Sequence, residues 1–326
     1  MTTTEPANDW DRAVDAPHPA PDPDRPLRAD CTVDRDGRMV VRLAPGAADR
    51  PRLLMRLRPP KGKPESITRM IDLEPEGPDG PEPDAPEPEG PDGPDGPAAS
   101  DPQPAGTVGG SRWPARRRRA VLDPEPALEE GRWDLYYLSS PGAERIRLTP
   151  GTRDLRALLA DRDPARTPLP LAVRVPYATG DGFLAVRTWL RPAHAEAGRV
   201  EADAASTTVR VRLFGAEPGE GSAALLRLRG KPGEVRETAL TVDGPHDVSF
   251  SFAQRELVSI PGDGPGIWDV LVRTSATARP IRVARLLDDV ADRKKVFVYP
   301  PVTLNGLTAR TYYTLDNEMS VEVTTA

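Results

Sequence analysis

Two Trp-Asp dipeptides, Trp133-Asp134 and Trp268-Asp269, are the residues whose types and spacing most suggest chemistry. An indole ring with a polar neighbour could form a stacking platform for a sugar. The competing interpretation is structural. Two residues after each tryptophan comes an apolar residue, which in a strand would point to the same face as the indole. A tryptophan in the middle of a strand is typical of a buried core. The sequence therefore predicts structural core positions for Trp133, Trp268 and Trp189.

A run of four arginines and three tyrosines are the candidate ligand contacts. Arginine forks pair bidentately with phosphate, so the run could attract a phosphate-rich polymer or an acidic partner. It could equally neutralise the acidic segment that precedes it in the chain, and the sequence favours this solvated edge. Exposed tyrosines would suit a glycan. The candidate contacts are Arg116, Arg117, Arg118, Arg119, Tyr177, Tyr312 and Tyr313.

The histidines argue against common catalytic and metal sites. Only His18, His194 and His246 are present, and they form no HExxH motif, no zinc set and no convincing Ser/His/Asp triad. Glycine-rich phosphate loops are missing from the sequence as well. The sequence predicts no catalytic residue, no cofactor and no metal ligand. His194, near an expected domain junction, is the one candidate acid or base.

These residues belong to an internal repeat, which decides the fold. Residues 39–43 match 209–213, and 54–58 match 225–229. The Gly-x-Trp-Asp segments and then 146–148 and 281–283 match at a shorter offset, so the first copy carries an insertion. The closing strands pair 171–175 with 295–299, and 183–190 with 307–315.

Apolar and polar residues alternate within the matched segments, which is typical of strands with one face on a core. Asp-Gly and Asn-Gly dipeptides between them are preferred in two-residue turns, so Asp181-Gly182 and Asn305-Gly306 are predicted to be turns rather than metal ligands. We predict an all-β chain of two tandem immunoglobulin-like β-sandwiches. The first spans 27–193 and the second 198–326, with disorder predicted at 1–26 and, in the Pro/Gly/acidic insertion, at about 75–111.

Composition narrows the partners and the compartment. The net charge is −6 and the sequence pI is about 5.4, so phosphates of nucleic acids should repel the chain. Cys31, the single cysteine, cannot form an intramolecular disulfide, which fits a reducing compartment. The first residues lack the pattern of a signal peptide, and no stretch approaches a membrane span. We expect a cytoplasmic protein that has no membrane span and does not bind nucleic acid.

The segment TPLPLAVRVPYATGDGFLAVRTWLRPAHAE, together with the paired Gly-x-Trp-Asp strands, resembles a known group of modules. These are the β-sandwich accessory modules of actinobacterial glycosyltransferases and glycerophosphotransferases that build teichoic-acid-like surface polymers. The resemblance covers both copies outside the insertion. It implies an accessory module that orients or oligomerises a transferase or holds its polymer. The nucleotide-sugar domain with its DxD-type motif has no counterpart in the sequence, so no catalytic residue carries over.

Three functions from different classes therefore remain open. The first is a non-catalytic tandem module that docks onto a partner transferase or onto itself. The second is a glycan- or polyanion-binding module that uses the arginines and tyrosines named above. The third is a glycosyl- or glycerophospho-transferase, which rests on family association alone.

Overall fold

The computed structural model describes residues 27–44, 48, 50–59, 67–76, 117–231, 233–258, 266–294, 296, 299–304 and 306–325. Strands make up most of them, which confirms the prediction of an all-β chain. The predicted disordered tail, 1–26, lies outside the described residues, and so does nearly all of the predicted disordered insertion, 75–111. Pro75 and Glu76 are exceptions, since Pro75 ends a strand and the Glu76 amide donates to the Arg117 carbonyl at 2.8 Å.

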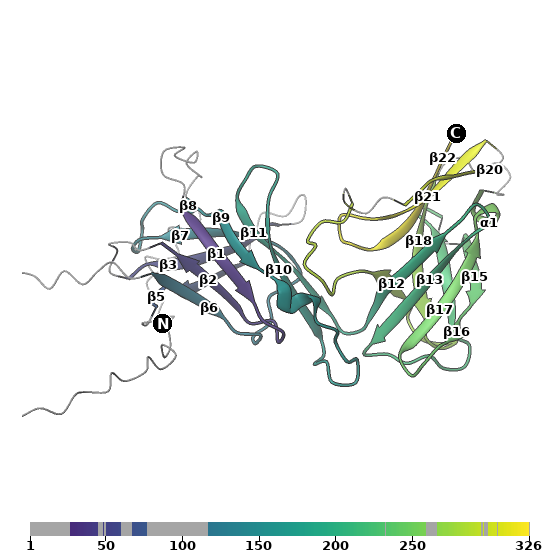
Figure 1. Ribbon diagram of the computed structural model, residues 1–326, viewed down its shortest axis with the longest axis horizontal. Coiled ribbons are helices and arrows are strands. Elements are labelled where there is room, and N and C mark those ends of the chain that lie inside the picture. The colour runs from purple at the N-terminus through teal and green to yellow at the C-terminus, as the bar shows by residue number, and fades with distance from the viewer. Residues whose placement is uncertain are drawn as a thin grey trace, which may run out of the picture.

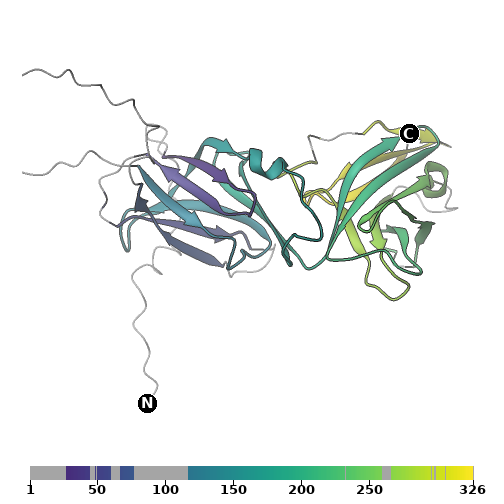
Figure 2. The same ribbon diagram turned by 60° about the horizontal axis from the view of Figure 1, so that its bottom comes forward.

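The strands form two bodies that lie side by side along the long axis of the molecule (Figure 1). The purple to teal strands stay apart from the green to yellow strands when the view is turned by 60° (Figure 2). We call the body that contains residues 28–191 the first unit and the body that contains residues 194–325 the second unit. Only Pro192 and Ala193 separate the last strand of one from the first strand of the other.

The first unit contains two sheets. The first has the order β5(Glu74–Pro75), β6(Arg118–Leu122), β2(Met39–Leu43), β1(Arg28–Val33) and β9(Thr149–Asp154). The second has the order β10(Leu171–Ala178), β11(Leu184–Arg191), β7(Gly131–Leu138), β3(Arg52–Leu57) and β4(Thr68–Asp72), and β8(Ile146–Arg147) pairs with β7. The pair β1 and β9 is parallel and the other pairs are antiparallel. A short 3-10 helix, η2(Arg156–Leu159), follows β9.

The second unit repeats this order. One layer runs β16(Thr241–Val242), β17(Asp247–Ala253), β13(Ser206–Phe214), β12(His194–Ala202) and β19(Ile281–Ala284). The other contains β20(Val302–Leu304), β21(Leu307–Tyr313), β22(Met319–Thr325), β18(Gly266–Arg273), β14(Ala223–Leu228) and β15(Val235–Ala239). The strand β19 pairs in parallel with β12 and antiparallel with β18, so it joins the two layers. The short helix α1(Gln254–Val258) follows β17.

The pairing corrects two details of the sequence alignment. In both units the last strand pairs with the Trp-Asp strand: β11 pairs with β7, and β22 pairs with β18. The strand β11 therefore corresponds to β22 rather than to 307–315, and β10 corresponds to β21 rather than to 295–299. Neighbouring antiparallel strands carry the same alternation, which explains the shift by one strand. The turns at Gly182 and Gly306 thus belong to different hairpins, although both glycines adopt positive φ, +84° and +73°. In addition, β12 begins at His194, before the predicted start of the second copy at 198.

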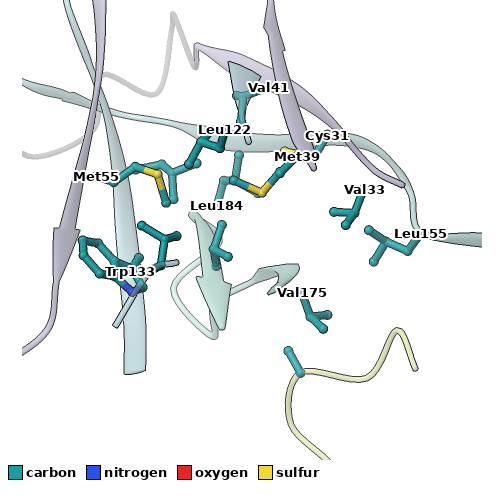
Figure 3. Close-up of a cluster of buried hydrophobic side chains, with 14 of the residues drawn as sticks. Cys31, Val33, Met39, Val41, Met55, Leu122, Trp133, Leu155, Val175 and Leu184 are labelled. Atoms are coloured by element: carbon teal, nitrogen blue, oxygen red, sulfur yellow. The ribbon is translucent and has the colours of Figure 1, made fainter. Parts of the chain in front are cut away.

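Each unit has a core that draws side chains from both of its layers. In the first unit, Met39 and Leu122 of one layer meet Met55, Trp133 and Leu184 of the other (Figure 3). In the second unit, Trp268 occupies the corresponding position on β18. The side chains of Trp133 and Trp268 are 0% and 1% exposed. The Trp133 indole N–H donates to the Glu129 carbonyl at 3.0 Å, so burial leaves its polar atom satisfied.

The thiol of Cys31 gives a probe of the first core. Cys31 lies on β1 and is 1% exposed, and burial, with the neighbouring Asp30 charge, raises the pKa of its thiol to about 12. Because thiolates rather than thiols react, we expect the native protein to resist a thiol reagent at about pH 8. Labelling should proceed only as fast as the first unit opens. Mass spectrometry of samples quenched at successive times measures this labelling rate. Immediate labelling of the native protein would contradict the burial.

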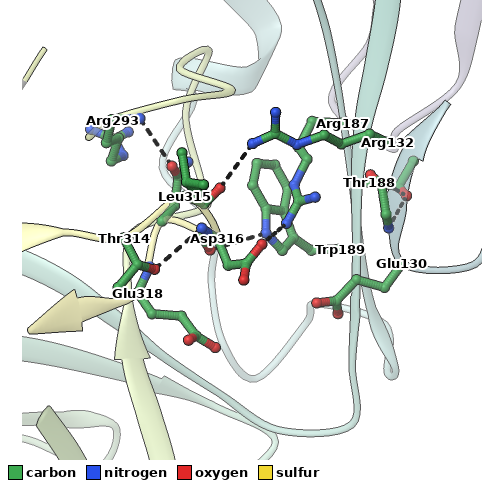
Figure 4. A network of polar contacts seen from close by, with 12 residues as sticks. Glu130, Arg132, Arg187, Thr188, Trp189, Arg293, Thr314, Leu315, Asp316 and Glu318 are labelled. Atoms are coloured by element: carbon green, nitrogen blue, oxygen red, sulfur yellow. Dashed lines mark hydrogen bonds and ion pairs between the residues drawn. The ribbon is translucent and has the colours of Figure 1, made fainter. Parts of the chain in front are cut away.

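The two units are in direct contact through the outer face of β11. Arg187 forms an ion pair with Asp316 of the second unit at 2.6 Å, and the Trp189 indole N–H donates to the Asp316 carbonyl at 3.4 Å (Figure 4). Thr188, between them, faces the first core, where it hydrogen bonds to the Trp133 indole at 3.2 Å. Trp189 is 1% exposed and belongs to the same buried cluster as Trp133, as expected for a core residue, and it also contacts the second unit.

Candidate functional site

Both Trp-Asp dipeptides place their aspartate at the centre of an arginine clamp. Asp134 accepts hydrogen bonds from Arg58 at 2.7 and 2.9 Å and from Arg147 at 3.2 Å. In the second unit, Arg282 donates to both oxygens of Asp269 at 2.8 Å, and Arg229 donates to one of them at 2.7 Å. The clamps use matching positions of the two copies, so the duplication holds for side-chain contacts as well as for strand order.

Local structure explains why these residues meet. The aspartate follows a tryptophan that points into the core, so it points to the outer face of the sheet. Arg58 and Arg229 directly follow the neighbouring strands β3 and β14, and Arg147 and Arg282 lie on β8 and β19 on the other side, so each clamp links three neighbouring segments across that face. In each Trp-Asp dipeptide the tryptophan thus packs in the core, and the aspartate binds arginines on the outer face of the sheet.

The contacts of the clamps shift the pKa values of two of their groups, Arg58 and Asp269. The hydrogen bonds that Arg58 donates to Asp134 raise the pKa of Arg58. Burial alone would raise the pKa of Asp269, but the hydrogen bonds from Arg282 and Arg229 outweigh it and hold the pKa below its usual value. Groups whose pKa values are displaced away from neutrality in this way are poorly suited to proton transfer. Their contacts describe binding and positioning.

The surroundings of the two clamps differ. In the second unit the clamp is closed, because the Ser320 hydroxyl donates to Asp269 at 3.2 Å and Glu318 pairs with Arg282 at 2.6 Å. In the first unit the clamp opens onto a hollow of about 600 Å³. Its polar and aromatic lining comes from Arg58, Arg132, Asp134, Tyr136, Arg147, Tyr177, Thr179, Asp181 and, from the second unit, Asp292. We call this cavity the clamp hollow.

Several polar groups line the clamp hollow. The Tyr177 hydroxyl oxygen is buried and has no hydrogen-bond partner among the described residues. Arg147 lies over the Phe183 ring at 3.8 Å and bonds to Asp181 at 2.9 Å. Hydrogen bonding, from Thr179 first and also from Arg147, lowers the pKa of Asp181 despite the opposing effect of partial burial. A carboxylate, guanidinium groups and a free hydroxyl can together donate to and accept from a hydroxyl-rich molecule.

The structure brings only one of the predicted ligand contacts into this hollow, Tyr177. Arg116 lies outside the described residues, and Arg117 directly precedes β6. Arg118 and Arg119 lie on β6, where Arg118 donates to the carbonyls of Leu73 and Ala48 at 3.2 and 2.7 Å. Arg118 is thus engaged with the backbone of its own unit.

The other two predicted tyrosines are not surface contacts. Tyr313 is 0% exposed inside the second core, and Tyr312 is 9% exposed. Successive residues of a strand point to opposite faces, so at most one of the two could have faced solvent. The other face is occupied as well, since Tyr312 pairs with Ser320 beside the closed clamp.

His194 is a structural residue in this fold. It is 2% exposed, its Nε2 lies 2.6 Å from Glu196, and its ring stacks on Phe214. Glu196 in turn accepts the backbone N–H groups of Leu286 and Leu287 at 2.8 and 3.2 Å. The sequence placed His194 in an open connector, but it begins β12 and holds a loop of the second unit in place.

By its fold and by the clamp hollow, the chain is a nearly all-β protein with a polar surface site. Comparisons with known proteins do not assign it to a family. No family model matches the chain, and no curated protein matches it. Among solved structures, S. aureus TarS shares 15% identity at a TM-score of 0.33, covering 47% of this chain and 28% of that one. The 217–571 fragment of S. aureus TarS shares 15% identity at a TM-score of 0.31, covering 59% and 44%.

The chain thus spans less than half the length of either of these structures. Within the described residues, no helix is long and apolar enough to cross a membrane. The same part of the chain contains no group of three or more His, Cys, Asp and Glu side chains that could hold a metal ion.

Proposed function

We propose that the chain is a non-catalytic binding module and that the clamp hollow takes a glycan. The observation that carries the proposal is the difference between the two clamps. The same Arg-Asp-Arg arrangement is closed by Ser320 and Glu318 in one unit and open, beside Tyr177, in the other. A purely structural clamp has no need of an open cavity with an unused hydroxyl group.

The lining of the clamp hollow favours hydroxyl groups over a bare polyanion. Its three arginines are balanced by three aspartates, Asp134, Asp181 and Asp292. Ion-paired arginines and aspartates still offer donors and acceptors to sugar hydroxyls, and Tyr136 and Tyr177 add apolar surface for a ring. A volume of about 600 Å³ also falls in the range of small-molecule sites, which is about 300 to 1,000 Å³.

The sequence resemblance suggests the setting for such a module. It implies a transferase that builds a cell-surface polymer, and the proposed role is to hold that polymer or to dock onto the enzyme. Docking onto the transferase is proposed on the resemblance alone. The contact through Trp189 and Asp316 supports a fixed arrangement of the two units, which suits a module that positions its ligand.

The sharpest test is Tyr177→Phe, which removes one hydroxyl group. Because that hydroxyl has no partner among the described residues, the melting temperature should stay unchanged. Loss of one hydrogen bond to the ligand should weaken binding by about 2- to 13-fold. Calorimetric titration with glycerol-phosphate oligomers, with and without sugar substituents, measures the affinity.

The matched control is Tyr312→Phe, beside the closed clamp of the second unit, which should leave binding unchanged. Equal binding of the sugar-bearing oligomer by wild type and Tyr177→Phe would contradict a glycan in the clamp hollow. Turnover of a nucleotide sugar or of CDP-glycerol by the purified protein would overturn the non-catalytic role.

A further inference from the structure

A second cavity, of about 590 Å³, lies where the two units meet. One wall is the 159–162 segment of the first unit, which begins at the last residue of η2. The other is the outer face of β12, β13 and β17, with Arg285 and Leu287 at one end. Five arginines line it: Arg162, Arg199, Arg210, Arg212 and Arg285. We call this cavity the junction groove.

Most of the acidic residues that line the junction groove already have partners. Glu196 bonds to His194 and accepts two backbone N–H groups. Asp247 and Asp161 both pair with Arg212, at 2.9 and 2.8 Å, and the second of these contacts crosses between the units. Only Asp243 of the lining carboxylates has no described contact through its side chain. Arg199 and Arg285 are paired as well, with Glu201 at 2.7 Å and with Asp288 at 3.3 Å.

Two arginines of the groove, one from each unit, have no carboxylate partner among the described residues. No ion pair or hydrogen bond joins the Arg162 or Arg210 guanidinium to another of the described residues. Burial lowers the pKa of Arg162, although Glu196 and Asp36 act in the opposite direction. A partly desolvated guanidinium without a hydrogen-bonded carboxylate, such as that of Arg162, gains from an incoming anion, because charge-assisted hydrogen bonds replace lost hydration. Arg210 is exposed on the facing strand.

The backbone of β12 is irregular at this point. Ala197 pairs with Val211 and Val200 with Val209, so two residues, Gly198 and Arg199, lie opposite Arg210. This is a β-bulge, a feature that redirects side chains and is common beside functional sites.

The first unit has neither feature. Its strand β1 pairs with β2 from Ala29 to Val33 without a shift in register, and Val40 occupies the position that matches Arg210. The arginine and the bulge therefore distinguish the second copy from the first. Neither is required for the strand order, because the first unit builds the same order without them.

We propose that the junction groove binds a phosphate group between Arg162 of the first unit and Arg210 of the second. Planar guanidinium forks match the geometry of phosphate oxygens, and two forks from opposite walls can bond to one group. The site uses residues from both units, so it exists only while the units are in contact. It is separate from the clamp hollow and does not depend on a glycan being bound there.

The test compares wild type with Arg210→Val, which installs the residue that the first unit carries at the matching position and should therefore fold. Calorimetric titration at low ionic strength uses three probes: inorganic phosphate, glycerol 3-phosphate and a glycerol-phosphate oligomer. Wild type should bind at least one, and Arg210→Val and Arg162→Ala should each weaken that binding by about tenfold or more. The control is Arg227→Val, an exposed arginine on β14, which should change nothing.

The three probes separate the source of the phosphate. Binding of inorganic phosphate and glycerol 3-phosphate supports a site for a free or terminal phosphate, and binding of the oligomer alone supports an internal phosphodiester. Wild type that binds no probe would overturn the proposal, as would unchanged affinity in Arg210→Val and Arg162→Ala. Tyr177→Phe should leave binding of inorganic phosphate intact, so failure of the clamp hollow and failure of the junction groove are distinguishable.

Discussion

Replacing Trp268 by alanine is expected to destabilise the second unit by about 3 to 5 kcal/mol, and Trp133→Ala should do the same to the first unit. Both side chains are at most 1% exposed and lie in the middle of a core. Removing the indole leaves a cavity that neighbouring strands can close only in part. Denaturant unfolding followed by circular dichroism measures the loss, and Cys31 labelling reports on the first unit alone.

An exposed residue provides the control for this pair. Val242 is 57% exposed, and Val242→Ala should change the unfolding free energy by less than about 0.5 kcal/mol. If Trp133→Ala and Trp268→Ala melted like wild type but lost ligand binding, the tryptophans would form a stacking platform and the core assignment would be wrong.

Replacing Trp189 by alanine should act on the contact between the units. Its indole is 1% exposed and lies beside Arg187, which forms the ion pair with Asp316. We expect a loss of about 3 to 5 kcal/mol, taken mainly from the coupling of the two units. Calorimetry should then resolve two transitions where wild type shows overlapping, coupled unfolding.

The comparison with Trp133→Ala makes this expectation specific. Trp133→Ala should lower the stability of the first unit alone, whereas Trp189→Ala should in addition make the unfolding of each unit less dependent on the other. Phosphate binding in the junction groove should fall in Trp189→Ala as well, since that site needs both walls. A single transition at the wild-type temperature would show that Trp189 does not couple the units.

Alternation and repetition were sufficient to predict an all-β chain and to match the clamp arginines between copies. Arg58 and Arg229, like Arg147 and Arg282, occupy matching places in the sequence and in the structure. The last strands were misassigned because the pattern of β11 resembles that of β21 as well as that of its true counterpart, β22. The alternation of apolar and polar residues indicates which face of a strand a residue lies on. Only the hydrogen-bonded pairing in the structure shows which strands are neighbours.

The sites were harder to predict than the fold. Tyr177 and Asp181 stood out in the sequence for separate reasons, and nothing in their spacing indicated that they share a cavity with Arg58 and Arg132. Arg210 alternates with apolar residues along β13, which is typical of an ordinary solvated face. Its significance appears only when the 159–162 segment of the other unit is seen to lie opposite.

The parallel pairing of β1 with β9, and of β12 with β19, bears on how the chain assembles. In each unit the first strand pairs with a strand that is synthesised much later. Folding of the unit therefore needs contacts between residues far apart in the sequence, and the edge of the first strand stays unpaired until the later strand is made. Two units with one topology also risk exchanging partners, a known failure of duplicated domains. The late strands differ in layout: in the first unit β9 pairs with β1 and a separate strand, β8, pairs with β7, whereas in the second unit β19 alone pairs with both β12 and β18. This difference allows each early strand to discriminate its own partner from that of the neighbouring unit.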